Sequence, residues 1–201
     1  MTDHTPARPE TGLTAAGISR RRLLAAAGGL ALGFMIHGRQ VWLSPREARA
    51  KGMPVDPFRE TEARTLTRLG NILTLNAGDE GLAHFISAQL RKPAAESLLM
   101  LRYMDVPPPH DSFYKSGLTA LDNAARARHG EGFAAVPDAA AEALVADMAE
   151  DAIDGWENAV PAPFFYFVVR ADAIDVTYGT MDGFRRMEVP YLAHIEPDEK
   201  W

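Results

Sequence analysis

The sequence predicts an all-α protein: a compact domain of about five to six helices over residues 51–201, with an irregular aromatic C-terminal tail and a signal segment in front. Two observations lead to this prediction. Apolar residues recur at spacings of three and four along most of the chain after residue 57. Proline, glycine and capping residues separate these runs where helices begin and end. The roughly 150 residues after position 50 suffice for one buried core.

The first two helices are expected on either side of an Asn-Ala-Gly sequence at 76–78. One begins at Pro57 and ends at this sequence, which suits a left-handed cap. The other covers Asp79–Arg91, where two acids in the first turn favour a helix N-terminus and Pro93 ends the run. Apolar residues that share a face in the first are Phe58, Leu66, Leu69, Ile72 and Leu73.

The middle of the domain predicts three further helices. Residues 94–104 form a short one, and the prolines at 107–109 after it must be extended. Ser116–Arg128 has Leu118, Leu121 and Ala125 facing inward and is closed by His129-Gly130. Ala139–Glu150 follows a Pro-Asp cap at 137–138.

The most apolar run, residues 164–169, is consistent with either a strand or a helix by periodicity alone. The residues after it continue one helical face, so we predict a buried helix over Pro161–Val176. Its inward face is expected to hold Phe164, Phe167, Ala171 and Ile174. Tyr178–Trp201, with two glycines and two prolines, is expected to be the irregular tail.

The N-terminal fifty residues read as a leader with an export signal. Ser19, Arg20, Arg21, Leu23 and Leu24 resemble the twin-arginine signal, an address read by a receptor. The uncharged segment Leu23–Ile36 would be only about 21 Å long as a helix, shorter than a bilayer core of about 30 Å. A surface basic cluster on an ordinary helix is the alternative interpretation.

Two features follow this segment. A small-x-small sequence at Ala48-Arg49-Ala50 is a candidate cleavage site, although it lies well beyond Ile36, and retention of the leader is the alternative. Ser44–Phe58 contains three prolines and a glycine and is interpreted as a linker. The predicted boundary between leader and domain is therefore 50/51.

Composition excludes several classes of function. Residues 51–201 carry 14 basic and 24 acidic side chains, a net charge near −10 that disfavours nucleic acid and anionic membranes. The chain has no cysteine, which excludes disulfides, thiolate metal sites and thioether haem attachment. No glycine-rich phosphate loop follows a strand, so no FAD or nicotinamide site is expected in this chain.

Metal or hydrolytic chemistry has only weak support. The six histidines include no His-x-x-x-His or His-Glu-x-x-His pair. Glu150, Asp151 and Asp154 lie at helical spacing, but a solvated helix end is the simpler interpretation. A metal-dependent hydrolase using His84, His110 or these acids is kept as an alternative, as is a small-molecule-binding module.

Aromatic and arginine side chains towards the C-terminus have the composition of an interface anchor. Most aromatic residues of the domain are expected in the core, but arginines near the C-terminus of an acidic protein can pair with acids on a partner. The candidate interface residues are Trp156, Tyr178, Phe184, Arg185, Arg186, Tyr191 and Trp201.

Several motifs together resemble the gluconate 2-dehydrogenase subunit 3 family over about residues 59–201. They are Gly117-Leu118-x-Ala120-Leu121-Asp122-x-Ala124-Ala125-Arg126, Gly132-Phe133, Phe164-Phe165 and Tyr178-Gly179-x-x-x-Gly183-Phe184-x-x-Met187-x-x-Pro190-Tyr191. One departure is Leu75-Asn76, where members often carry Ile-Pro. Members of the family also have a twin-arginine leader.

The resemblance implies a helical, non-catalytic small (gamma) subunit without a cofactor of its own. It would bind an FAD-containing catalytic subunit of the glucose-methanol-choline type and escort it, folded, through twin-arginine export. A cytochrome c subunit carrying haem c would then pass electrons onward. The expected location is the periplasm, with the complex associated with the inner membrane.

Overall fold

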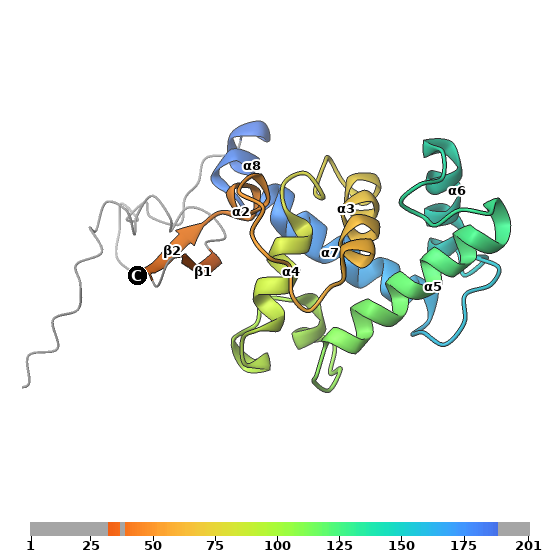
Figure 1. Cartoon of the computed structure of the whole chain (residues 1–201), viewed down its shortest axis with the longest axis horizontal. Helices are drawn as coiled ribbons and strands as arrows, with labels where there is room; N and C mark the ends of the chain where they lie inside the picture. The colour runs from red at the N-terminus through yellow and green to blue at the C-terminus, as the bar shows by residue number, and fades with distance from the viewer. Residues whose placement is uncertain (1–31, 37–38, 189–201) are drawn as a thin grey trace, which may run out of the picture.

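The computed structural model describes residues 32–36 and 39–188, and helices make up most of this part of the chain (Figure 1). A two-stranded antiparallel hairpin comes first, with Leu32 opposite Leu43 and Ile36 opposite Arg39. The strands are β1 (Leu32–Ile36) and β2 (Arg39–Leu43), and the helices are α2 (Pro45–Ala50), α3 (Glu60–Leu73), α4 (Leu82–Leu90), α5 (Asp111–His129), α6 (Asp138–Ala149), α7 (Ala162–Tyr178) and α8 (Met181–Arg186). The prediction of an all-α fold is confirmed.

Helix α7 is the central element of the body. It contacts α3, α4, α5, α6 and α8, and it runs along most of the length of the helical body (Figure 1). Its inward side is fully buried at Phe165, Val168, Val169 and Ala173. The hairpin, α2 and α8 gather at one end of the body, whereas α5 and α6 meet at the other (Figure 1).

Close contact between α5 and α7 depends on a glycine. A Cβ atom at Gly117 of α5 would lie 2.3 Å from the ring of Phe165, so only glycine lets the ring approach the α5 backbone this closely. The same part of α5 buries Leu118, Leu121 and Ala125, as its periodicity predicts.

The segment between α4 and α5 contains two short 3₁₀ helices, η1 (Ala94–Glu96) and η2 (Met100–Tyr103), instead of the single helix expected over 94–104. η2 is fixed to α7, because the backbone N–H of Met100 donates to Asp172 Oδ1 at 2.9 Å. Leu99 and Leu101 on either side of this bond are fully buried.

Three other boundaries differ from expectation. α3 begins at Glu60 and α4 at Leu82, each about three residues after the expected start, and the residues before α4 form turns around Gly81 at φ +97°. α5 begins at Asp111 rather than Ser116, because Asp111 is favourable in the first turn and accepts a bond from Lys115 at 3.0 Å.

The expected linker over 44–58 was wrong in its first part, which contains α2. Ser44 and Glu47 form a capping box: the Glu47 N–H donates to Ser44 Oγ at 3.2 Å, and the Ser44 N–H donates to Glu47 Oε2 at 2.8 Å. Pro45 then occupies the first helical position, which suits its fixed φ. Proline and glycine content had suggested a linker, but the Ser-Pro-Arg-Glu sequence is a helix start.

The prediction of an irregular C-terminal tail over Tyr178–Trp201 was wrong in its first part, which contains a helix. Residues 181–186 form α8, with Thr180 Oγ1 accepting from the Gly183 N–H at 3.0 Å as its N-cap. The part of the expected tail after residue 188 lies outside the described residues. So do the arginine pair and the first nine residues of the apolar segment expected at 23–36, whose last five residues form β1.

Candidate functional site

The outward side of α7 is apolar. The predicted inward side held Phe164, Phe167, Ala171 and Ile174. This prediction holds for Phe164, which packs against the core with its ring 5.5 Å from that of Phe113, but it is wrong for the other three. Phe167 is 47% exposed, while Phe165 on the opposite side is fully buried. Both sides of α7 are apolar, so periodicity could not choose between them. The contact of Phe165 with Gly117 decides the orientation.

The exposed apolar residues of α7 form a continuous line that we call the outer stripe. Successive members are three or four residues apart, so they lie along one line on the helix for about 22 Å. The stripe consists of Pro163, Phe167, Ala171, Ile174 and Tyr178, all partly or largely exposed. Helical geometry places the exposed Arg170 and Asp175 on its two edges. Apolar residues contiguous at a surface and bordered by charges are typical of a protein–protein contact.

The structure places the predicted interface residues in different settings. Trp156 serves the core: its Nε1–H donates to the Val160 carbonyl at 2.8 Å, and its ring lies 5.6 Å from that of Phe165. Tyr178 is the last member of the outer stripe, and Phe184 is half-buried in α8. Exposed Arg185 belongs to α8 as well, whereas Tyr191 and Trp201 lie outside the described residues.

Arg186 has partners inside the chain. Its Nη1 lies 3.3 Å from Glu80 Oε1, and its Nη2 donates to the Thr177 carbonyl at 3.2 Å. Sequence reasoning had considered this arginine for pairing with acids on another protein. Within this chain it holds α8 to α7 and to the turn before α4.

A buried polar cluster lies between α5, α7 and η2. The hydroxyl of Tyr114 donates to Asp172 Oδ2 at 2.6 Å, and the Met100 N–H donates to the other oxygen. Burial raises the pKa of Asp172 to about 7, although both hydrogen bonds oppose this rise. Burial and the neighbouring Asp172 carboxylate raise the pKa of Tyr114 well above its usual value, so the phenol stays a neutral donor.

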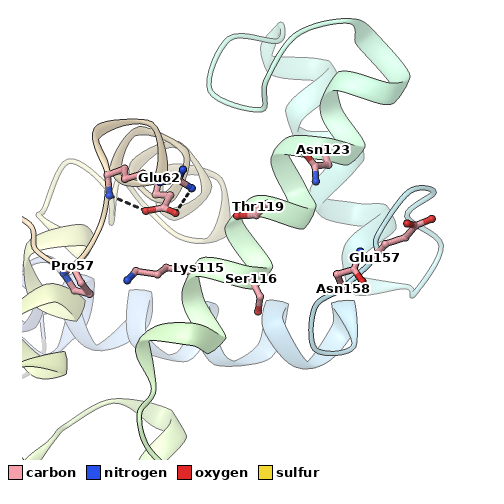
Figure 2. A pocket seen from close by; sticks show the side chains of 9 residues that line it. Pro57, Glu62, Lys115, Ser116, Thr119, Asn123, Glu157 and Asn158 are labelled. Atoms are coloured by element: carbon pink, nitrogen blue, oxygen red, sulfur yellow. Dashed lines mark hydrogen bonds and ion pairs between the residues drawn. The ribbon is translucent and has the colours of Figure 1, made fainter.

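An open polar cleft of about 480 Å³ lies between the start of α3, α5 and the loop at 157–158 (Figure 2). Glu62 accepts from the Arg59 backbone at 2.8 Å and from its guanidinium at 2.7 Å. Burial alone would raise the pKa of Glu62, but Arg59 outweighs it and lowers that pKa below its usual value. Lys115 is bonded to Asp111. The cleft's main charges are thus already paired within the chain.

The residues considered for metal or hydrolytic chemistry are not brought together. Nε2 of His84 lies 3.0 Å from the Met53 carbonyl and Nε2 of His110 lies 2.9 Å from the Val106 carbonyl, so each must donate there. Burial lowers the pKa of His84 below its usual value, which favours the neutral ring. Within residues 32–36 and 39–188, no three His, Asp or Glu side chains are grouped to hold a metal ion.

Helices in the same part of the chain are all too short or too polar to cross a bilayer.

The motifs that carried the resemblance are mainly structural. Gly117 admits Phe165, and the carboxylate of Asp122 accepts from the Phe133 N–H at 2.9 Å while it pairs with Arg126 at 2.9 Å. Phe133 belongs to the loop between α5 and α6, and its side chain is fully buried. The signature therefore specifies the packing of α5, the loop after it and α7, the helix that carries the outer stripe.

A comparison with protein families agrees with this signature. The family model described as gluconate 2-dehydrogenase subunit 3 matches residues 60–183, more than half of the chain. The matched region begins with α3 and ends within α8. No curated protein and no solved structure matches the chain.

Proposed function

Because this chain belongs to the gluconate 2-dehydrogenase subunit 3 family, we propose that it is the non-catalytic small subunit of a periplasmic sugar or sugar-acid dehydrogenase complex. In this proposal it binds an FAD-containing catalytic subunit of the glucose-methanol-choline type and holds no cofactor itself. The flavoprotein, which has no signal of its own in this scheme, is exported in the folded state with this subunit. A cytochrome c subunit with haem c completes the complex at the inner membrane.

The observation that carries the binding role is the outer stripe of α7. A buried helix normally hides aromatic side chains, yet Phe167 leaves nearly half of its surface in water. Its neighbours along the stripe, Ala171 and Ile174, are also partly exposed. Helix α7 thus has two apolar sides, one packed in the core of the chain and one that we assign to a partner. We therefore assign the outer stripe to the contact with the flavoprotein.

The export role is supported by the sequence Ser19-Arg20-Arg21-x-Leu23-Leu24. It is also supported by the composition of the folded domain that follows this sequence. A pathway that transports folded proteins suits a subunit whose partner must take up FAD before it crosses the membrane. The chain has no cysteine, so its folding needs no oxidising compartment.

Co-purification tests the binding role. Phe167→Ser should reduce the amount of flavin-bearing protein recovered with the tagged subunit at least tenfold, with the circular dichroism of the free subunit unchanged. Leu75→Ser is the matched control, because Leu75 is 64% exposed and belongs to the turn after α3 rather than to the outer stripe. Equal recovery with both variants would contradict the assignment of the outer stripe.

Fractionation tests the export role. Replacement of Arg20 and Arg21 by lysine should leave the flavoprotein in the cytoplasm, whereas Arg8→Lys, a conservative change in the same leader, should not. Flavoprotein that reaches the periplasm with both arginines replaced would remove this part of the proposal.

A further inference from the structure

The chain from Leu32 to Ala50 is built into the folded body, although it begins within the expected signal segment. The described residues here, 32–36 and 39–50, are called the N-terminal unit. Leu32, Phe34 and Leu43 are each at least 94% buried, and Ala48 is fully buried. β1 and α2 both contact α4. The guanidinium of Arg91, just after α4, lies 5.7 Å from the centre of the Phe34 ring.

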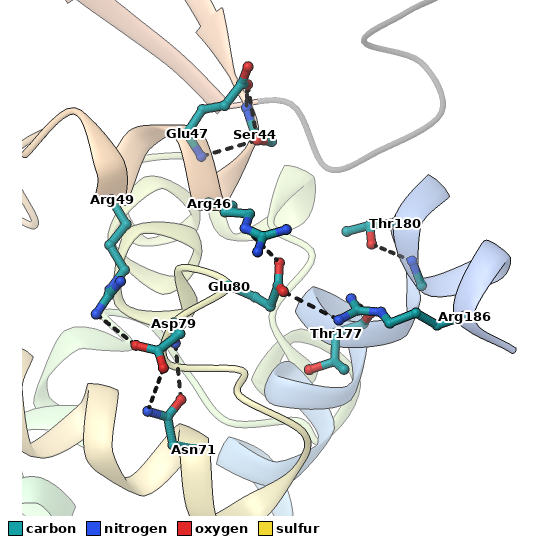
Figure 3. A network of polar contacts seen from close by, with 11 residues as sticks. Ser44, Arg46, Glu47, Arg49, Asn71, Asp79, Glu80, Thr177, Thr180 and Arg186 are labelled. Atoms are coloured by element: carbon teal, nitrogen blue, oxygen red, sulfur yellow. Dashed lines mark hydrogen bonds and ion pairs between the residues drawn. The ribbon is translucent and has the colours of Figure 1, made fainter.

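Two ion pairs fasten α2 to the turn before α4 (Figure 3). Arg49 Nη2 lies 2.7 Å from Asp79 Oδ1, and Asp79 is itself oriented by Asn71, whose Oδ1 accepts from the Asp79 N–H at 3.0 Å. Glu80 has Arg46 Nε at 3.7 Å and Arg186 Nη1 at 3.3 Å. The Glu80 side chain is only 10% exposed, so it joins α2 to α8 in a largely dry setting.

The body is also shaped to receive α2. Gly81 has φ +97°, and a Cβ atom there would lie 2.2 Å from the Pro45 carbonyl oxygen. Only glycine permits both this backbone conformation and this approach. Residue 81 lies within the matched family region, and its backbone leaves room there for the Pro45 carbonyl.

This arrangement protects the candidate cleavage site Ala48-Arg49-Ala50. The Ala48 N–H donates to the Ser44 carbonyl at 2.9 Å, and the Ala48 carbonyl accepts from the Met53 N–H at 3.0 Å. Arg49 is held by Asp79. A peptidase binds its substrate as an extended segment and cuts where backbone is exposed and unpaired. Cleavage at Ala50 would require α2 to unfold and detach.

We propose that residues 32–50 stay in the mature subunit, and that any cleavage that removes the arginine pair falls before Leu32. This proposal rests on the proposed export of the chain. Only ten residues, 22–31, separate Arg21 from the N-terminal unit, a reach of at most about 36 Å. The export receptor would therefore read the arginines close to a body that is already folded.

The intact mass of the subunit, purified as the native complex from a periplasmic or membrane fraction, tests this proposal. A chain that begins at or before Leu32 is the expected result. A chain that begins after Leu32, at Lys51 above all, would overturn the proposal. In Ala50→Asp, which removes the small residue at the candidate site, the mass should change only by the substitution; a mature chain lengthened towards its N-terminus would also overturn it.

Hydrogen exchange of the purified full chain tests whether residues 32–50 belong to the folded body, and this measurement does not depend on export. Amides of α2 should exchange at least about 100-fold more slowly than unprotected amides, as part of the cooperative body. Gly81→Ala should abolish most of this protection, while Gly130→Ala should not. Both glycines have positive φ, but a Cβ atom at Gly130 would meet nothing within 4 Å. Wild-type α2 amides that exchange as fast as unprotected amides would overturn the proposal.

The intact mass and the hydrogen exchange together distinguish a failure of the proposed export from a failure of the inference about processing. Subunit found only in the cytoplasm contradicts the proposed export, and hydrogen exchange still decides whether residues 32–50 belong to the body. Exported subunit that begins at Lys51 leaves the proposed function intact and overturns only the inference about processing.

Discussion

The hydroxyl of Tyr114 and a carboxylate oxygen of Asp172 are 2.6 Å apart, and neither side chain reaches solvent. Fifty-eight residues separate them in sequence, and with Met100 they join α5, α7 and η2 at one point. The Asp172 carboxyl group is fully buried, and its two oxygens accept from the Met100 N–H and the Tyr114 hydroxyl. This cluster makes the stability of the subunit depend on pH.

We predict that the contribution of Asp172 to stability falls as pH rises from about 4 to about 7. The pKa of Asp172 is about 7 in the folded state and near 3.8 in the unfolded chain, so the folded protein binds more protons in this interval. The contribution is at most about 1.4 kcal/mol per pH unit, or about 4 kcal/mol in all. The advantage of the wild type over Asp172→Asn, measured by urea unfolding, should shrink between pH 5 and pH 8. Glu142→Gln, at an exposed site in α6, should follow the wild type.

A second prediction concerns Gly117. Alanine normally stabilises a helix interior by about 1 kcal/mol over glycine, but Gly117→Ala should destabilise this protein by about 1–3 kcal/mol. The added methyl would lie 2.3 Å from the Phe165 ring. A double-mutant cycle with Phe165→Leu should recover part of the loss, because the smaller side chain leaves space for the methyl. A stabilising Gly117→Ala would contradict the described packing of α5 on α7.

The orientation of α7 gives a third prediction. Phe165→Ala should lower the free energy of unfolding by about 3–5 kcal/mol, since it empties a fully buried site. Phe167→Ala should change it by less than about 1 kcal/mol, because this ring is nearly half exposed. Chemical denaturation of both variants measures the difference. Similar losses from the two would mean that the helix is rotated.

A fourth prediction concerns the two arginines that share Glu80. Arg186→Gln should destabilise the free subunit by about 1 kcal/mol, because Arg186 bonds both the Glu80 carboxylate and the Thr177 carbonyl. Arg46→Gln should matter less, since this side chain is 63% exposed and its nitrogen is 3.7 Å from Glu80. Thermal unfolding of the free subunit compares them, and a larger effect at Arg46 would argue against this account.

Local sequence signals predicted the main helices well. α5 and α6 show one apolar face, with a positive-φ glycine at 130 and a proline at 137 marking their limits. α2 was missed because its neighbourhood is rich in proline, although Ser44 and Glu47 form a recognisable capping box. α8 was missed because Gly179 and Gly183 suggested irregular chain, although Thr180 is an effective N-cap.

The candidate site was less accessible to sequence reasoning. α7 is apolar on both sides, so a helical period did not tell Phe165 from Phe167. The distinction comes from Gly117, 48 positions earlier in the chain, and no local pattern contains it. The pairing of Arg186 with Glu80 spans 106 residues and is likewise a property of the tertiary fold. The cleavage site, the arginine pair and the interface residues beyond 188 stay predictions, as does the domain boundary at residue 50.

The pairing of Glu80 with Arg46 of α2 and Arg186 of α8 has a practical consequence for detecting this subunit in a cell. Because α2 and α8 are joined at Glu80, both ends of the described chain lie at one end of the body (Figure 1). The exposed turn at Gly130-Glu131 lies at the opposite pole, between α5 and α6. A small epitope inserted in that turn would report on the subunit from a position far from the segment proposed to carry the export signal.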